Sequence, residues 1–224
     1  MKRHLSFLVC LLIGCAPMVA QNGLVPIRGS LDDKISQLYD AALKSSLLGG
    51  NWQLAYKVLP SFTPEYALVC NVTEKKLTLR EADEQIYEIQ LYYGTTQIDT
   101  SKIKVSKYEM IVDESLVQAL DSLLSHVTKT SSDRNKTIGG FDGVSYYFFS
   151  RNYSGECWSP SSGSYAHRLV TFMDAVCSMV KQGDASQESA LTEQARTLQE
   201  SALLLNKASG TAKKRQGKRA KRRR

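Results

Sequence analysis

The spacing of apolar residues changes several times along this chain of 224 residues, and these changes constrain its fold more than any other feature. In residues 31–48, 113–127 and 164–183, apolar side chains recur every three or four positions, as on one face of an α-helix. Between residues 65 and 112 they mostly alternate with polar ones, which is typical of β-strands with one face in water. Helices and strands are therefore expected in separate stretches of the chain.

Several stretches are predicted to form strands because they alternate or are rich in β-branched and aromatic residues. They are residues 65–72, 75–80, 85–93, 102–112, 144–150 and 156–159. Short connections between neighbouring strands favour antiparallel pairing. We therefore predict an α+β fold, in which an antiparallel sheet of about five or six strands has helices packed on one face. Residues 21–183 are expected to form this single domain.

Residues 184–210 differ from the predicted domain because they contain no aromatic residue. Their apolar residues follow a spacing of four and three, which predicts a helix with a narrow apolar seam: Leu191, Ala195, Leu198, Ala202 and Leu205. We expect an accessory helix that lies along the domain, although such a seam also suits a dimerising or partner-binding helix. Ser209, Gly210 and Thr211 are expected to end it, and residues 211–224 are predicted to be a disordered basic tail.

The net charge of +7 comes from the C-terminal tail. Without residues 213–224, 20 Lys and Arg face 22 Asp and Glu, so the remainder carries −2, or −4 once Lys2 and Arg3 are also removed. A mildly acidic body lacks the basic surface that nucleic-acid binding needs, so nucleic acid is not an expected partner. The tail is a candidate for binding anionic lipid or an anionic envelope polymer, or else a solvated end without a specific role. Its cations are Lys213, Lys214, Arg215, Lys218, Arg219, Lys221, Arg222, Arg223 and Arg224.

The first twenty residues have the pattern of a secretory signal. A short basic head, residues 1–4, precedes the apolar run of residues 5–13, which is too short to span a bilayer as a helix. We therefore expect segment 1–20 to direct export and then to be removed. The protein is expected in the periplasm or the outer cell envelope.

The end of the apolar run carries a more specific pattern. Leu12, Ile13, Gly14 and Cys15 resemble the lipobox of bacterial lipoproteins. The resemblance implies that Cys15 becomes the mature N-terminus and carries the lipid that anchors the protein to a membrane. The alternative is an ordinary cut after Ala20, which would yield a secreted protein.

Cys157 and His167 form the nucleophile–base pair that the sequence offers for catalysis. A catalytic thiolate needs an imidazole within hydrogen-bonding distance, so this pair is the basis for a thiol-dependent hydrolase or transferase. The candidate is weak because no catalytic motif surrounds the two residues. With Cys70 and Cys177, Cys157 predicts either three free thiols or one disulfide. Clustered Cys and His residues are absent from the sequence, so no metal site and no cofactor are expected.

Aromatic residues gather in the strand predicted at residues 144–150 and just after it. One interpretation is a central strand that is covered on both faces. The other is an exposed aromatic surface that binds a glycan or a peptide, with Tyr147, Phe149, Tyr153 and Trp158 as the candidate residues.

Together these features predict an exported protein of the cell envelope that acts as a non-enzymatic binding or interaction module. Two alternatives stay open at this point. One is the thiol enzyme that would use Cys157 and His167, and the other is a binder of anionic polymers that acts through its tail.

Overall fold

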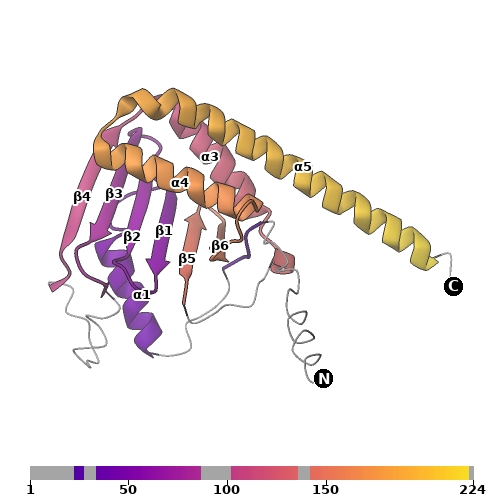
Figure 1. Ribbon diagram of the computed structural model, residues 1–224, viewed down its shortest axis with the longest axis horizontal. Helices are drawn as coiled ribbons and strands as arrows, with labels where there is room; N and C mark the ends of the chain where they lie inside the picture. Colours follow the sequence, from indigo (N-terminus) through magenta and orange to yellow (C-terminus); the bar gives the residue numbers. More distant parts are fainter. Residues whose placement is uncertain (1–22, 28–33, 87–101, 136–141, 222–224) are drawn as a thin grey trace, which may run out of the picture.

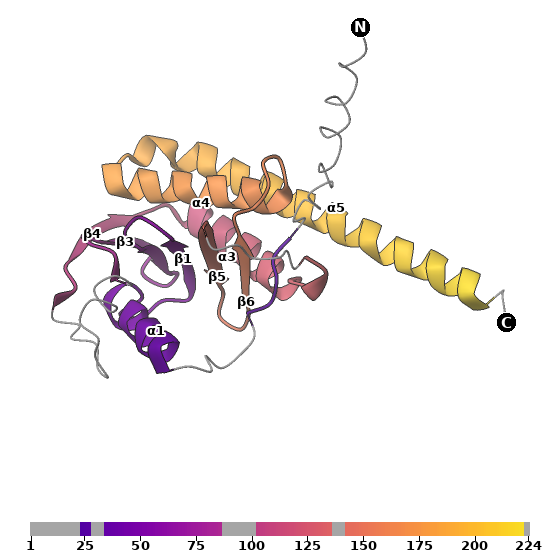
Figure 2. The ribbon, with the colours of Figure 1, turned by 60° about the horizontal axis from the view of Figure 1, so that its bottom comes forward.

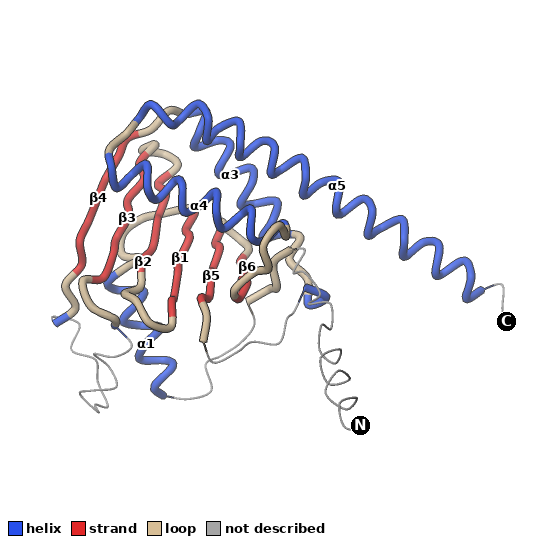
Figure 3. Tube along the Cα trace, in the orientation of Figure 1, coloured by secondary structure: helices blue, strands red, loops and turns tan. Residues whose placement is uncertain are grey.

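The computed structural model describes residues 23–27, 34–86, 102–135 and 142–221 (Figure 1). Its described strands form one antiparallel sheet of six strands in the order β4-β3-β2-β1-β5-β6 (Figure 3). The strands are β1 (Leu54–Pro60), β2 (Tyr66–Asn71), β3 (Lys76–Ala82), β4 (Val105–Ile111), β5 (Val144–Phe149) and β6 (Ser154–Trp158). The predicted α+β fold with an antiparallel sheet is confirmed.

The strand β1 lies at the centre of the sheet, although sequence analysis did not predict it. It pairs with β2 on one side and β5 on the other, so that Tyr56 lies opposite both Leu68 and Phe148. The strand predicted at residues 85–93 falls mostly outside the described residues, and the two described ones, Gln85 and Ile86, are not in a strand.

Two helices cover one face of the sheet. They are α3 (Glu114–Lys129) and α4 (Tyr165–Gln182), whose apolar stripes form the main core with alternate residues of the strands. The side chain of Ser164 accepts a hydrogen bond from the backbone of His167 at the start of α4, and Gly183 ends this helix in the left-handed conformation. The predicted limits of this helix are confirmed.

The helix α1 (Lys34–Ser46) lies on the opposite face of the sheet, as Figure 2 shows. Its side chains Ala42 and Leu43, together with Leu47 just after it, form a second cluster with Ala55 and Val69 of the strands. The expectation of helices on one face therefore holds for α3 and α4, whereas α1 covers part of the other face. The reason is that β1 and β2 are apolar on both faces and bury both.

The helix α5 (Glu188–Lys221) packs along α3 and α4, as the prediction of an accessory helix required. Of its predicted seam, Leu191, Ala195, Leu198 and Ala202 are buried. The helix continues through residues 209–211, where an end was expected, and through much of the predicted tail, whose Lys, Arg and Ala residues are good helix formers. The side chains beyond Asn206 lie outside the description, and disorder of the tail stays a prediction.

Candidate functional site

Cys157 lies on β6 with its side chain in the main core, opposite Tyr146 of β5. It is 2% exposed. Burial, assisted by the nearby Glu156, raises the pKa of its thiol to about 12. A nucleophilic cysteine needs the opposite shift, which a neighbouring cation or a helix N-terminus produces. The surroundings of Cys157 therefore keep its sulfur protonated and covered at neutral pH.

His167 does not supply the missing base. It lies in the first turn of α4, where its backbone N–H donates to Ser164 Oγ at 3.1 Å. Among the described residues, no hydrogen bond joins His167 to Cys157. Cys70, Cys157 and Cys177 are all free and buried, so the described residues contain three thiols and no disulfide between them.

The four aromatic candidates for ligand binding do not form one surface. Tyr147 and Phe149 are half-buried and lie on the α1 side of the sheet. Tyr153 is 46% exposed in the turn between β5 and β6. Trp158 lies at the far end of the same hairpin, paired with Ser145. The four residues are therefore neither all covered within the sheet nor all exposed on one binding surface.

Tyr147 and Phe149 instead surround a buried lysine. The Nζ atom of Lys57 lies 4.7 Å from the ring centroid of Tyr147 and 5.9 Å from that of Phe149. It is 3.5 Å from Oδ1 of Asp40 on α1, and Lys57 as a whole is 5% exposed. Burial lowers the pKa of the Lys57 amine, and Asp40 opposes this shift. This cluster joins α1 to the sheet, with the lysine side chain buried inside it.

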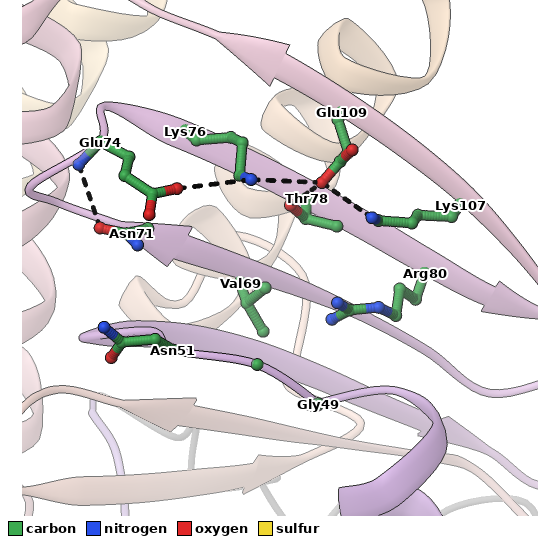
Figure 4. A pocket seen from close by; sticks show the side chains of 11 residues that line it. Gly49, Asn51, Val69, Asn71, Glu74, Lys76, Thr78, Arg80, Lys107 and Glu109 are labelled. Carbon is green, nitrogen blue, oxygen red and sulfur yellow. Dashed lines mark hydrogen bonds and ion pairs between the residues drawn. The ribbon is translucent and has the colours of Figure 1, made fainter.

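An open recess of about 180 Å³ lies beside this cluster, on the α1 side of β2, β3 and β4 (Figure 4). The segment that follows α1 closes one side of it. Its lining is almost entirely polar or glycine: Gly49, Gly50, Asn51, Val69, Asn71, Glu74, Lys76, Thr78, Arg80, Lys107 and Glu109. The recess is therefore suited to a polar ligand rather than an apolar one.

Ion pairs cross one wall of the recess. Oε1 of Glu109 lies 3.0 Å from Nζ of Lys107 and 3.5 Å from Nζ of Lys76. It also accepts a hydrogen bond from Oγ1 of Thr78 at 3.3 Å. Lys76 lies 3.4 Å from Glu74 as well. The two lysines are thus balanced by two carboxylates, as the dashed lines in Figure 4 show.

Arg80 adds a positive charge without such balance. Its Nη1 donates to the backbone oxygen of Leu47 at 3.1 Å, which satisfies a carbonyl near the end of α1. In the part of the chain that the structure describes, no carboxylate forms an ion pair with Arg80. The charged side chains lining the recess sum to +1, and Arg80 is the source of the excess.

A buried amide also faces this space. Asn71 is 7% exposed and lines the recess. Its Oδ1 accepts from the backbone N–H of Glu74 at 3.0 Å. No described protein atom accepts from its Nδ2, so two N–H donors are left for a bound molecule or water. Arg80 and Asn71 therefore provide a cation and neutral donors in one cavity.

Sequence analysis missed these residues because they come from four separate segments. The sequence signal was an alternation of charged and apolar residues in 75–80, which predicted a solvent-facing strand surface and not a site. Only the register of β2, β3 and β4 brings Asn71, Arg80 and Lys107 around one cavity.

Among the described residues, no three His, Cys, Asp or Glu side chains are grouped closely enough to hold a metal ion.

No protein-family model matches this chain, and no curated protein or solved structure is significantly similar to it. The interpretation of the recess therefore depends on its own geometry.

Proposed function

We propose that the protein is an exported, non-enzymatic binding module of the cell envelope, and that the recess beside α1 is its ligand site. The ligand class is a small hydroxylated molecule with one anionic group. A carboxylated sugar unit and a phosphorylated sugar unit both belong to this class.

The observation that carries this proposal is the guanidinium of Arg80, which lines the recess without a carboxylate partner among the described residues. A guanidinium binds carboxylates and phosphates with two parallel hydrogen bonds, so it is well suited to the anionic group. The amide of Asn71 can donate to a hydroxyl or ring oxygen of the same ligand. Lys76 and Lys107 are balanced by Glu74 and Glu109, so the net positive charge of the recess is that of Arg80.

The size of the recess limits the ligand. A volume of about 180 Å³ is smaller than the roughly 300–1,000 Å³ of sites for drug-sized molecules. One sugar-sized group fits such a space, and a longer glycan would have to bind through its end or a single unit.

Isothermal titration calorimetry tests the proposal with three probes: glucuronate, glucose 6-phosphate and neutral glucose. We expect at least one of the two anions to bind and glucose to bind at least tenfold more weakly, because it lacks the group that Arg80 recognises. Which anion binds better distinguishes a carboxylate site from a phosphate site. Binding should weaken with added salt because the recess is open to solvent.

Two variants assign the binding to the recess. Arg80→Gln removes the charge but keeps an N–H donor for Leu47, and we expect at least a tenfold loss of affinity. Arg196→Gln is the matched control, because Arg196 lies on α5 and its side chain is 56% exposed. If both anions fail to bind, or if Arg80→Gln binds as well as Arg196→Gln, the recess is not the ligand site.

The exported location is a separate part of the proposal, since residues 1–20 lie outside the described residues. Its support is the basic head, the apolar run and the resemblance to a lipobox at Cys15. Mass spectrometry of the native N-terminus distinguishes an acylated Cys15 from a free Gln21. An intact Met1 on most of the protein would contradict export.

A further inference from the structure

The two ends of the described body meet at the C-terminal end of α3. On the N-terminal side, the backbone oxygen of Leu24 accepts hydrogen bonds from the N–H of Ser132 at 2.8 Å and from Nδ2 of Asn135 at 3.1 Å. Val25 also pairs with Glu156 of β6 through two backbone hydrogen bonds. Leu24 and Val25 are thus held beside β6 and the end of α3.

The helix α5 leaves the body at the same place. Nδ2 of Asn206 lies 3.1 Å from Nε2 of His126, which is in the last turn of α3. Beyond this contact α5 extends away from the body on the side of β6, as both Figure 1 and Figure 2 show. Leu24, the contact of Asn206 with His126 and the part of α5 that extends beyond it therefore lie at one pole of the described molecule.

The surface of this pole carries exposed apolar and basic side chains. Three consecutive leucines of α5, Leu203, Leu204 and Leu205, are 40%, 66% and 38% exposed. The turn between β5 and β6 joins the pole through a hydrogen bond of 2.9 Å between Ser150 and Thr128 of α3. It presents Arg151 and Tyr153, and α3 ends at the exposed Lys129. Asp133 and Glu156 are acidic residues nearby. We call this surface the β6 pole.

We propose that the β6 pole is a membrane-facing surface whose partner is an anionic phospholipid bilayer. This inference rests on the exported location proposed above, but not on the ligand of the recess. Leucine and tyrosine side chains are suited to the interface between lipid headgroups and acyl chains. The nine cations of residues 213–224 are complementary to anionic headgroups.

The lengths of the connecting segments agree with a single surface. Residues 16–23 separate Cys15 from Leu24 and span at most about 30 Å when extended, so a lipid on Cys15 can reach the bilayer that the pole contacts. The tail begins seven residues after Asn206, on the helix that already leaves from this pole. A lipid and a basic segment together attach a protein more firmly than either alone.

This attachment also agrees with the position of the recess. The recess lies over β2, β3 and β4, whereas β6 is at the other edge of the sheet. A body attached through the β6 pole therefore keeps the recess open to the surrounding solution.

Vesicle co-sedimentation tests the proposal with the full chain in its Cys15→Ser form, so that no lipid contributes. The probes are vesicles of phosphatidylcholine with 30% phosphatidylglycerol and vesicles of phosphatidylcholine alone. We expect at least tenfold stronger binding to the anionic vesicles, and a further loss of at least tenfold when the nine tail cations are replaced by Gln. Equal binding to both vesicles would overturn the proposal, as would tighter binding to DNA or to an anionic polysaccharide.

A second pair of variants tests the pole itself. Leu204→Ser removes an exposed leucine of the pole and should weaken binding to anionic vesicles about threefold or more. Phe62→Ser is the matched control, because Phe62 is 74% exposed in the turn between β1 and β2, at the other end of β1 from the β5–β6 turn. Equal vesicle binding by the two variants would show that the tail binds without the pole and would overturn the inference. Binding of anions to the recess in the absence of vesicles is unaffected by either result.

Discussion

Glu188 at the start of α5 accepts a hydrogen bond of 2.7 Å from the backbone N–H of Asp113, the residue that precedes α3. The side chain of Asp113 makes no capping hydrogen bond of its own, so a carboxylate from a distant part of the sequence takes this place. Glu188 is 7% exposed. The contact joins the beginnings of α3 and α5 and places a negative charge where the helix dipole of α3 is positive.

Replacing Glu188 with Ala should lower the free energy of unfolding by about 1–2 kcal/mol, because the backbone N–H of Asp113 loses its acceptor. Glu188→Gln keeps an acceptor oxygen and should lose less. Urea denaturation measures both, with Glu193→Ala as control, since Glu193 has a side chain that is 72% exposed. Equal stability of the Glu188→Ala and Glu193→Ala variants would contradict the role of this contact.

A second prediction concerns two tyrosines that share one acceptor in the core. The hydroxyls of Tyr56 and Tyr66 both donate to Oδ1 of Asp174 on α4, at 2.9 and 3.0 Å. Each single change to Phe should lower the free energy of unfolding by about 1–2 kcal/mol. The double variant should lose more than the sum, because only then is the carboxylate left without both donors. Strictly additive losses in urea denaturation would argue against a shared site.

The same cluster predicts a dependence on pH. Burial raises the pKa of the Asp174 carboxyl, and the hydrogen bonds from the tyrosines oppose this shift. Without them the pKa in the folded state rises further, so the folded double variant binds a proton more readily than the unfolded chain does. The stability deficit of the double variant should therefore shrink as the pH falls from 7 toward 4. A deficit that grows with acidity would contradict this account.

Much of the fold could be predicted because its signals are local. Ser164 and Gly183 mark the ends of α4 in the sequence, and alternation marks β3 and β4. By contrast, β1 was missed because Lys57 interrupts its apolar residues. A lysine is rarely buried unless it is paired, and the residues that accommodate this one, Asp40 and Tyr147, come from other elements.

The candidate site could not be predicted for a related reason. Lys76, Arg80 and Lys107 look like ordinary charged residues on the wet face of two strands. Whether such charges are paired depends on strand register, which places Arg80 opposite Lys107 and leaves Arg80 without a carboxylate among the described residues. By contrast, the pairing of Cys157 with His167 was suggested by closeness in sequence, and the strand carries the thiol into the core instead.

The buried thiols give a further prediction. At pH 8 a thiol with a pKa of about 12 has roughly 10³-fold less thiolate than one with a pKa near 9, so burial and protonation both slow its reaction. Ellman's reagent should therefore detect almost no thiol in the native protein without its signal segment, and three thiols, Cys70, Cys157 and Cys177, in denaturant. Rapid reaction of Cys157 with the reagent in the native protein would instead support a thiol-dependent enzyme.

Lys57 gives the last prediction. Because burial lowers the pKa of its amine, the unfolded chain binds a proton more tightly than the folded protein does at this position. The charge of Lys57 therefore destabilises the fold at neutral pH, and this cost disappears as the pH rises through the folded pKa toward 10.5, the ordinary value. When Lys57 is replaced, the carboxylate of Asp40 still has a second partner, Nζ of Lys44, at 2.7 Å.

Lys57→Met should consequently leave the free energy of unfolding at pH 7 unchanged or raise it by up to about 2 kcal/mol. Its advantage over the unsubstituted protein should fall as the pH approaches 10.5, where Lys57 of the folded unsubstituted protein is mostly neutral and no longer carries the cost of a buried charge. Lys44→Met is the control. Lys44 pairs with the same carboxylate of Asp40, but its side chain is 67% exposed, so this variant should show neither the gain in stability nor its pH dependence. If Lys57→Met lost several kcal/mol at pH 7, the ion pair with Asp40 and the aromatic contacts would outweigh the cost of burial.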